Sequence, residues 1–257
     1  MKIAASDYDG TLFRQKTIAA EDVDGVRQWR AAGHKFGVVT GRDYGMLVPQ
    51  LRHYGVAFDY VVCDNGGLIC RADGTPLWQG QIPLAVLADM VKEDVVCRSF
   101  HFAFSAIDRT YLYHESEGSW ISREAQEWDF RIEKITEEYI PNLPQIHQFA
   151  LGYPTAEEAN AASQTVNERY GDTVHAYPNG CSVDITPKGV SKRQGIDKLV
   201  ELMGWSSPEV YAIGDETNDL PMIEAFHGFT VATARAAIKE KAERVYSSVG
   251  AMLVDCL

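Results

Sequence analysis

The chain has 257 residues, 46% of them hydrophobic, and its 36 acidic and 24 basic side chains give a formal charge of −12. This length and composition predict a folded protein of one large domain or two unequal domains, and the negative charge argues against nucleic acid as a partner, because binding to its phosphates needs clustered Lys and Arg. The sequence lacks the long uncharged apolar run of a membrane span or signal peptide, so we expect a cytoplasmic protein with no membrane partner.

The first predicted strand, Ile3 to Ser6, leads into Asp7-Tyr8-Asp9-Gly10-Thr11. Alternate residues of an extended segment point to the same side, so Asp7 and Asp9 can act together. The carboxyl end of such a strand is where open α/β sheets bind ligands. Asp7 could attack a phosphoryl group and Asp9 could move a proton, since an aspartyl-phosphate divides one difficult displacement into two easier ones. A solvated Asp-Gly turn is the alternative interpretation at this point.

A second apolar strand, 36–39, follows a predicted helix and leads into Thr40-Gly41-Arg42. Strand, helix and strand with short connections form a right-handed parallel unit, so Thr40 should lie beside Asp7. The Thr40 hydroxyl and a backbone N–H could hold a phosphoryl oxygen there. Ordinary strand-to-helix turn chemistry is the alternative.

The helix before this strand has Thr17 as its predicted N-cap, and the helix after it should be interrupted at Pro49. A third strand, 60–63, follows. Just after its end lies Asn65, which is a candidate substrate contact as well as a turn residue. Apolar segments on either side of Asp73-Gly74 then predict a β-hairpin.

Between about residues 82 and 186 the pattern changes to hairpin-like strands alternating with helices. This predicts a separate α+β domain inserted into a parallel core, with the core divided into 1–81 and 187–257. Phe102 and Phe104 alternate with smaller or polar residues, which is the period of a half-buried antiparallel strand, and we assign these aromatics to core packing. The histidines lack metal-ligand spacing and are predicted to be exposed or hydrogen-bonded: His101, His114, His147 and His175.

The parallel pattern resumes where Lys188-Gly189-Val190-Ser191-Lys192 opens a helix. Lys192 lies in the first helical turn, where the helix dipole disfavours a cation. A lysine at such a position indicates an anionic partner, and a solvated surface lysine is the alternative.

The next strand, 209–213, leads into Gly214-Asp215-Glu216-Thr217-Asn218-Asp219. Asp215 adds a third carboxylate at the sheet edge that carries Asp7 and Asp9. Three oxygen ligands with room for water and a phosphate oxygen suit Mg²⁺. A cation is also needed for an acidic pocket to accept an anionic substrate.

Four of these segments, in this order, resemble the motifs of the haloacid dehalogenase-like superfamily, and specifically its Cof-type phosphatases with a large α+β (C2-type) cap. The resemblance implies an α/β fold with a Rossmann-like parallel-sheet core and an inserted α+β cap. It also implies a magnesium-dependent phosphatase, a phosphoric monoester hydrolase, acting on a small phosphorylated metabolite such as a sugar phosphate. The matching segments are Asp7-Tyr8-Asp9-Gly10-Thr11, Val39-Thr40-Gly41-Arg42, Gly189-Val190-Ser191-Lys192 and Gly214-Asp215-Glu216-Thr217-Asn218-Asp219.

The resemblance implies a role for each matched residue. Asp7 would be the nucleophile, and Asp9 would protonate the leaving alkoxide and then deprotonate the attacking water. Mg²⁺ would be held by the Asp7 carboxylate, the Asp9 backbone carbonyl and Asp215, with Asp219 behind them. The phosphoryl group would be surrounded by the backbone amides of Tyr8 and Gly41 and by the side chains of Thr40, Lys192 and Asn218.

Three segments depart from the family pattern, and they put the closest subgroup in doubt rather than the chemistry. Tyr8 stands where a small aliphatic residue is more usual, Ala232-Thr233-Ala234 replaces Gly-Asn-Ala, and Ser247-Ser248-Val249-Gly250 lacks the usual acidic-Gly-Val ending.

The alternatives to a phosphatase are a phosphomutase of the same superfamily and a non-enzymatic phospho-aspartate regulatory module. A dehalogenase is disfavoured, because it would need neither Asp9 nor a metal. His101, Tyr113 and Asn179 are candidate substrate contacts in the cap. The substrate and the oligomeric state are left open.

Overall fold

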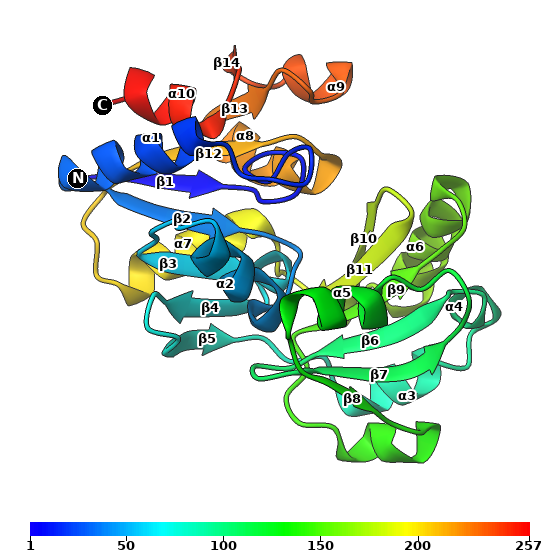
Figure 1. The fold of residues 1–257 in the computed structure, drawn as a ribbon. Helices are drawn as coiled ribbons and strands as arrows, with labels where there is room; N and C mark the ends of the chain where they lie inside the picture. The colour runs from blue at the N-terminus through cyan, green and yellow to red at the C-terminus, as the bar shows by residue number, and fades with distance from the viewer.

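The computed structural model describes all 257 residues, which form two bodies, each built on one sheet (Figure 1). The larger body contains an eight-stranded sheet in the order β14-β13-β12-β1-β2-β3-β4-β5, in which all pairs are parallel except the antiparallel β3–β4 and β4–β5 pairs. Its strands are β1 (Lys2–Ser6), β2 (Lys35–Val39), β3 (Tyr60–Cys63), β4 (Leu68–Arg71), β5 (Pro76–Gln79), β12 (Glu209–Gly214), β13 (His227–Val231) and β14 (Arg244–Tyr246). The ends of β1, β2 and β12 therefore lie at one edge of the sheet.

Helices cover both faces of this sheet, because its central strands are apolar on both sides. Trp29 and Leu47 are buried against one face, and Ile196 and Leu199 against the other. The first face carries α1 (Ala20–Ala31), α2 (Tyr44–His53) and α10 (Val249–Asp255), and the second carries α7 (Lys192–Leu202) and α8 (Leu220–Ala225). Three short elements complete this body: η1 (Asp64–Gly66), η3 (Thr217–Asp219) and α9 (Ala236–Lys239).

The smaller body contains a six-stranded sheet in the order β10-β11-β9-β6-β7-β8, antiparallel except for the β7–β8 pair. Its strands are β6 (His101–Ser105), β7 (Thr110–Glu115), β8 (Ile132–Lys134), β9 (Gln148–Gly152), β10 (Val174–Asn179) and β11 (Ser182–Pro187). One face packs on α3 (Leu84–Met90), α4 (Asp94–Cys97), α6 (Ala156–Tyr170) and η2 (Glu137–Asn142), and the other packs on α5 (Ile121–Trp128).

This arrangement confirms the predicted fold class, a parallel-rich α/β core with an α+β cap. The division at residues 82 and 186 stays a prediction, although the six cap strands do run consecutively from β6 to β11. None of the helices combines the length and the apolar character needed to cross a lipid bilayer.

Two predicted helix features are wrong. Thr17 does not cap α1, which begins after Ala19, because Thr17 pairs with Arg14 in a turn through two backbone hydrogen bonds of 2.9 and 3.0 Å. Pro49 does not interrupt α2, since the burial of neighbouring apolar side chains such as Leu47 outweighs one lost hydrogen bond. The unpredicted cap of α2 is Asp43, whose carboxylate accepts the Met46 N–H at 2.7 Å.

Strand β6 is buried on both faces rather than half-buried. Phe104 stacks on Phe149 with ring centroids 4.6 Å apart, which confirms the assignment of these aromatics to the core. The opposite face is not solvated, because Ala103 packs with Ile121 of α5 and with Met46 of the larger body. In β6, the face that carries the smaller and polar residues therefore packs against α5 and the larger body and is not exposed to solvent.

The histidine predictions fail at His101. His114 and His175 are exposed, and His147 is buried with its Nε2 3.1 Å from Gln79 Oε1. His101 is fully buried against the Trp120 ring, and neither of its ring nitrogens has a hydrogen-bond partner. A neutral imidazole tolerates this site better than an imidazolium does.

We expect the buried imidazole to make the protein acid-sensitive. Burial lowers the pKa of His101 to about 4, so the unfolded chain binds a proton more tightly than the folded chain between pH 6.5 and pH 4. His101 therefore costs no stability well above pH 6.5. Below that pH the free energy of unfolding decreases, by about 2 kcal/mol at pH 5. Replacing His101→Leu should remove this loss, as measured by urea unfolding at pH 7.5 and pH 5. The exposed His114→Leu serves as the control, and an unchanged pH dependence in His101→Leu would contradict the prediction.

Candidate active site

Three carboxylates meet at the carboxyl edge of the large sheet. Asp7 follows β1, Asp215 follows β12, and Asp219 ends η3, and oxygens of all three lie within 4.8 Å of one another. The parallel pairing of β1 and β12 sets this geometry, since Asp7 N donates to Ile213 O at 2.8 Å. Thr11 Oγ1 donates to Asp215 Oδ1 at 2.6 Å and so joins the two loops.

Burial and mutual repulsion raise the pKa values of carboxylates in this cluster. Burial, with the nearby Asp219 carboxylate, raises the pKa of Asp7 well above its usual range. Burial also raises the pKa of Asp215 to about 6. A bound cation would relieve both effects, and carboxylate oxygens are the ligands that Mg²⁺ prefers. The residues present therefore fit a magnesium ion.

Lys192 is the buried counterion of the cluster. Its Nζ lies 2.6 Å from both Asp7 Oδ1 and Asp219 Oδ1. Burial alone would lower the pKa of Lys192, but the two carboxylates outweigh it and raise the pKa above its ordinary value. Ser191 caps α7 at this point by accepting the Gln194 N–H at 3.4 Å. The alternative of a solvated surface lysine is thereby excluded.

Asp219 stabilises the loop around Asp215 through hydrogen bonds to its backbone. Its Oδ2 accepts the backbone N–H groups of Asp215 and Glu216 at 2.9 and 3.0 Å, and its Oδ1 is held by Lys192. Gly214 permits this contact, because a Cβ there would lie 2.4 Å from the Asp219 carboxyl carbon.

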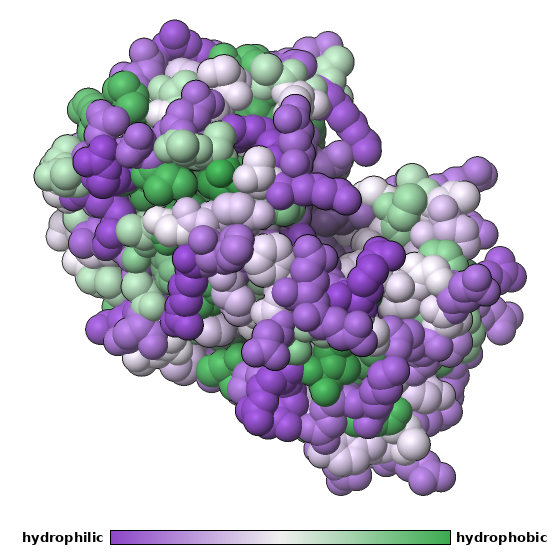
Figure 2. Space-filling model, viewed as in Figure 1, coloured by the Kyte–Doolittle hydropathy of each residue, from purple (hydrophilic) through white to green (hydrophobic).

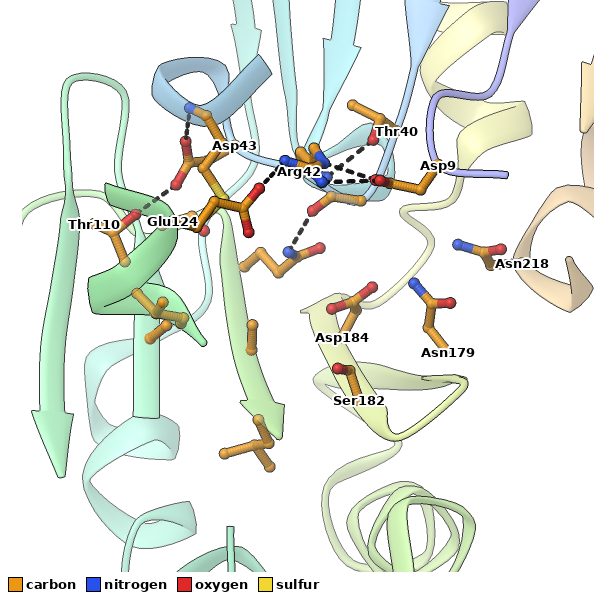
Figure 3. A pocket seen from close by; sticks show the side chains of 18 of the residues that line it. Asp9, Thr40, Arg42, Asp43, Thr110, Glu124, Asn179, Ser182, Asp184 and Asn218 are labelled. Carbon is orange, nitrogen blue, oxygen red and sulfur yellow. Dashed lines mark hydrogen bonds and ion pairs between the residues drawn. The ribbon is translucent and has the colours of Figure 1, made fainter. Parts of the chain in front are cut away.

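Asp9 is not part of the cluster of three carboxylates. Its side chain is about half exposed and receives a bidentate pair of hydrogen bonds from Arg42 at 2.7 and 2.8 Å (Figure 3). Arg42 also forms an ion pair with Glu124 of α5, so one guanidinium joins the two bodies. This role of Arg42 was not predicted from the sequence, although its place directly after Thr40-Gly41 at a strand end is a usable signal.

Thr40 and Gly41 lie at the same edge, as predicted from the β1–β2 pairing. The Gly41 carbonyl accepts a hydrogen bond from Gln148 of β9 at 2.8 Å. A Cβ on Gly41 would lie 2.9 Å from Asp184 Oδ2 of β11, so a larger residue at this position would displace the Asp184 side chain.

Asn65 links the two bodies rather than projecting freely into solvent. Its Nδ2 donates to Gln148 Oε1 at 2.9 Å and to Asp184 Oδ2 at 3.0 Å, and its Oδ1 accepts from Asn218 at 3.1 Å. Asn65 is buried with a φ of 51°, a conformation that asparagine adopts more readily than most residues.

The Tyr8 side chain is buried in the larger body, so only the Tyr8 backbone is available at the carboxyl edge of the sheet. Its hydroxyl donates to Gln50 at 2.8 Å, its ring stacks on Phe13, and the Arg42 guanidinium lies 5.3 Å from the ring centre. A large aromatic at this position thus supports the residue that binds Asp9.

A cavity of about 310 Å³ lies where the two bodies meet. The surface is hollowed there, and the residues around the hollow are mainly hydrophilic (Figure 2). Of the candidate cap contacts, Asn179 lines the cavity, whereas His101 and Tyr113 are not among its lining residues. From the predicted site it gathers Asp7, Asp9, Thr40, Gly41, Lys192 and Asn218.

We expect Gly10→Ala to weaken magnesium binding. Gly10 has a φ of +83°, and a Cβ there would lie 2.3 Å from Asp215 Oδ2. The displaced carboxylate should raise the Kd for Mg²⁺ by about 10- to 100-fold, as measured by calorimetry. Gly33→Ala is a matched control, because its φ is +85° and no atom lies near its Cβ position. Both variants should lose about 1 kcal/mol of stability, but only Gly10→Ala should lose metal affinity. Equal Mg²⁺ affinity in the two variants would contradict this expectation.

Comparison with known proteins gives consistent matches. Residues 4–250 match the family described as haloacid dehalogenase-like hydrolase. Pyridoxal phosphate phosphatase YbhA of Escherichia coli is 26% identical over 262 aligned positions, which cover 95% of this chain and 92% of that protein. A phosphoglycolate phosphatase of Methanothermobacter thermautotrophicus is 27% identical over 252 positions, covering 96% of this chain and 93% of that protein.

Solved structures share the fold over the whole chain. A haloacid dehalogenase-like hydrolase from B. subtilis has a TM-score of 0.85 at 20% identity, and the alignment covers 100% of both chains. A HAD/COF-like hydrolase from Plasmodium vivax has a TM-score of 0.82 at 19% identity, with 99% of this chain and 94% of that one covered.

Proposed function

Since the chain belongs to the haloacid dehalogenase-like hydrolases, of the Cof type, we propose that it is a magnesium-dependent phosphatase that hydrolyses a small phosphorylated metabolite through an aspartyl-phosphate. The observation that carries the proposal is the cluster of Asp7, Asp215 and Asp219, in which the buried Lys192 pairs with Asp7 and Asp219. Asp7 and Lys192 line the cavity between the two bodies. The phosphatase names of the two relatives support the same reaction class.

In the first step Asp7 attacks the phosphorus atom of the substrate. Lys192 holds Asp7 Oδ1, so Oδ2 is the oxygen left for the attack. A bond forms between Asp7 Oδ2 and phosphorus while the bond from phosphorus to the leaving oxygen breaks. Asp9 gives its proton to the departing alkoxide, and an alcohol leaves.

In the second step water attacks the phosphorus of the aspartyl-phosphate. Asp9, now ionised, takes one proton from the water as the new oxygen–phosphorus bond forms. The bond to Asp7 breaks, inorganic phosphate is released, and both carboxyl groups return to their starting states. Because Arg42 binds ionised Asp9, Asp9 must turn from Arg42 to act as the acid.

The Asp7 and Asp215 carboxylates and the Asp9 backbone carbonyl are the groups that would hold Mg²⁺. When bound, the ion supplies positive charge next to the transferring phosphoryl oxygens. Asp219 would position these groups, since both of its oxygens already accept hydrogen bonds.

The phosphoryl group would lie among the neutral and cationic donors at this edge. Hydrogen-bond donors fixed before the reaction stabilise charge that develops on phosphoryl oxygens. The proposed donors are the backbone amides of Tyr8 and Gly41, the Thr40 hydroxyl, Lys192 and Asn218. A cytoplasmic location and the partner metabolite stay predictions.

The test is the hydrolysis of p-nitrophenyl phosphate and of a panel of sugar phosphates by the wild-type protein, with Mg²⁺ and with EDTA. We expect magnesium-dependent release of inorganic phosphate in equal amount to the alcohol. Substrate isomerisation without phosphate release would instead identify a phosphomutase. No turnover despite measurable Mg²⁺ binding would overturn the proposed enzymatic function and favour a phospho-aspartate regulatory module.

A further inference from the structure

The cavity between the two bodies is lined by far more negative than positive charge. Its lining contains six carboxylate residues but only two cations, Arg42 and Lys192. Both cations are already paired, Arg42 with Asp9 and Glu124, and Lys192 with Asp7 and Asp219. One magnesium ion and one phosphoryl dianion would cancel each other and leave this excess unchanged.

The wall that faces the leaving group comes from the smaller body, and it contributes no Lys, Arg or His to the lining. Asn179 and Ser182, at the tip of the β10–β11 hairpin, lie across from Asp9 and Asn218, with Asp184 beside them (Figure 3). Apolar side chains such as Trp120 and Ile121 complete this wall. It therefore offers neutral hydrogen-bonding groups, apolar surface and carboxylates, but no free positive charge.

We propose that the leaving group of the natural substrate carries no second anionic group, so that the substrate is the phosphomonoester of an uncharged or cationic hydroxylated compound. This inference rests on the proposed phosphatase function and specifies its substrate class. A carboxylate or second phosphate on the leaving group would face Glu124 and Asp184 without a compensating cation, and such like-charge contacts disfavour binding.

Asp184 is the residue best placed to reject an anion. It is buried, lines the cavity and forms no salt bridge; its Oδ2 accepts a hydrogen bond from the neutral Asn65 amide at 3.0 Å. Burial raises the pKa of Asp184 to about 6, which leaves the carboxylate ionised at pH 7.5. Glu124 is weaker in this role, because Arg42 neutralises part of its charge.

The experiment compares two non-hydrolysable ligands that differ only in charge. In 3-hydroxypropylphosphonate and 3-phosphonopropanoate a methylene group replaces the ester oxygen, and the far end is a hydroxymethyl group or a carboxylate. Their affinities for the wild-type protein with Mg²⁺ are measured by calorimetry at pH 7.5. Because neither ligand is hydrolysed, the result does not depend on turnover, which p-nitrophenyl phosphate tests separately.

We expect the hydroxyl ligand to bind at least about tenfold more tightly than the carboxylate ligand. Equal affinities, including no binding of either, or tighter binding of the carboxylate would overturn the proposal. The hydrolysable esters, 2-hydroxyethyl phosphate and 2-phosphoglycolate, should show the same preference in kcat/KM.

The isosteric variant Asp184→Asn tests whether Asp184 causes the preference for the hydroxyl ligand over the carboxylate ligand. It should reduce the preference for the hydroxyl ligand by about threefold or more, chiefly by improving the binding of the carboxylate. A merely structural role would change both affinities together and leave their ratio at the wild-type value. Glu127→Gln, an exposed change in α5 one turn from Glu124, is the control and should leave the ratio unchanged. An unchanged ratio in Asp184→Asn would overturn the assignment to Asp184.

Discussion

Replacing Asp7→Asn is expected to lower kcat for phosphomonoester hydrolysis by about 10⁴-fold or more, because an amide oxygen is a poor nucleophile toward phosphorus. The measurement is phosphate release under saturating Mg²⁺, together with an acid-quench test for a labelled phospho-enzyme. The control is Asp24→Asn on the exposed side of α1, which should keep wild-type turnover. Substantial residual activity in Asp7→Asn would require another nucleophile.

The same substitution should not weaken the fold, and this separates loss of chemistry from loss of structure. Because the pKa of Asp7 is raised, its ionised form opposes folding, and that penalty grows as the pH rises. Asn keeps an oxygen that can accept from Lys192 and removes one negative charge from the cluster. In EDTA at pH 7.5 we therefore expect Asp7→Asn to be more stable than the wild type by about 1 kcal/mol. Lower stability than the wild type would contradict this reasoning.

Replacing Lys192→Met is expected to damage both stability and activity. Without its ammonium group, Asp7 and Asp219 are left as buried carboxylates with no cation within hydrogen-bonding distance. Removing one partner of a buried ion pair costs about 3–5 kcal/mol, and loss of a charged donor at the phosphoryl group should lower kcat by about 10²- to 10³-fold.

Urea unfolding with and without Mg²⁺ tests this prediction. Magnesium should restore part of the lost stability, since it replaces the missing positive charge. The loss should also be smaller at pH 5 than at pH 8, because protonation of Asp7 removes the repulsion. Lys188→Met is the matched control: Lys188 lies four residues earlier, is largely exposed, and pairs only with the exposed Asp172. Similar losses in the two variants would show that the buried pair contributes little.

The sheet and the positions of the carboxylates could be predicted from the sequence because both depend on local patterns. Buried strands followed by polar residues are readable within a few positions, and parallel pairing then brings Asp7 and Asp215 to one edge. Lys192 was identified in a similar way, from its unfavourable place at a helix start.

The contacts between the two bodies could not be predicted, because they depend on how separately folded parts dock. Arg42 and Glu124 are 82 residues apart, and Asn65 and Asp184 are 119 residues apart. No periodicity in either segment indicates the other. His101 failed for the same reason: its alternation with aromatics suggested a surface position, and only the docking of α5 and the larger body buries that face.

The pairing of β1 with β12 has a consequence for the order in which the protein can be assembled. Ile3 lies opposite Val210, so the strand that leads into Asp7 gains this neighbour only after the whole smaller body has been synthesised. The six strands of the smaller body are contiguous in sequence and can pair earlier, while one side of β1 still lacks its partner. Contacts of such long sequence separation slow folding and expose unpaired strand edges. A nascent chain ending before Glu209 therefore has neither the β1–β12 pairing nor Asp215, and it acquires the active site only after β12 and the loop that follows it have been synthesised.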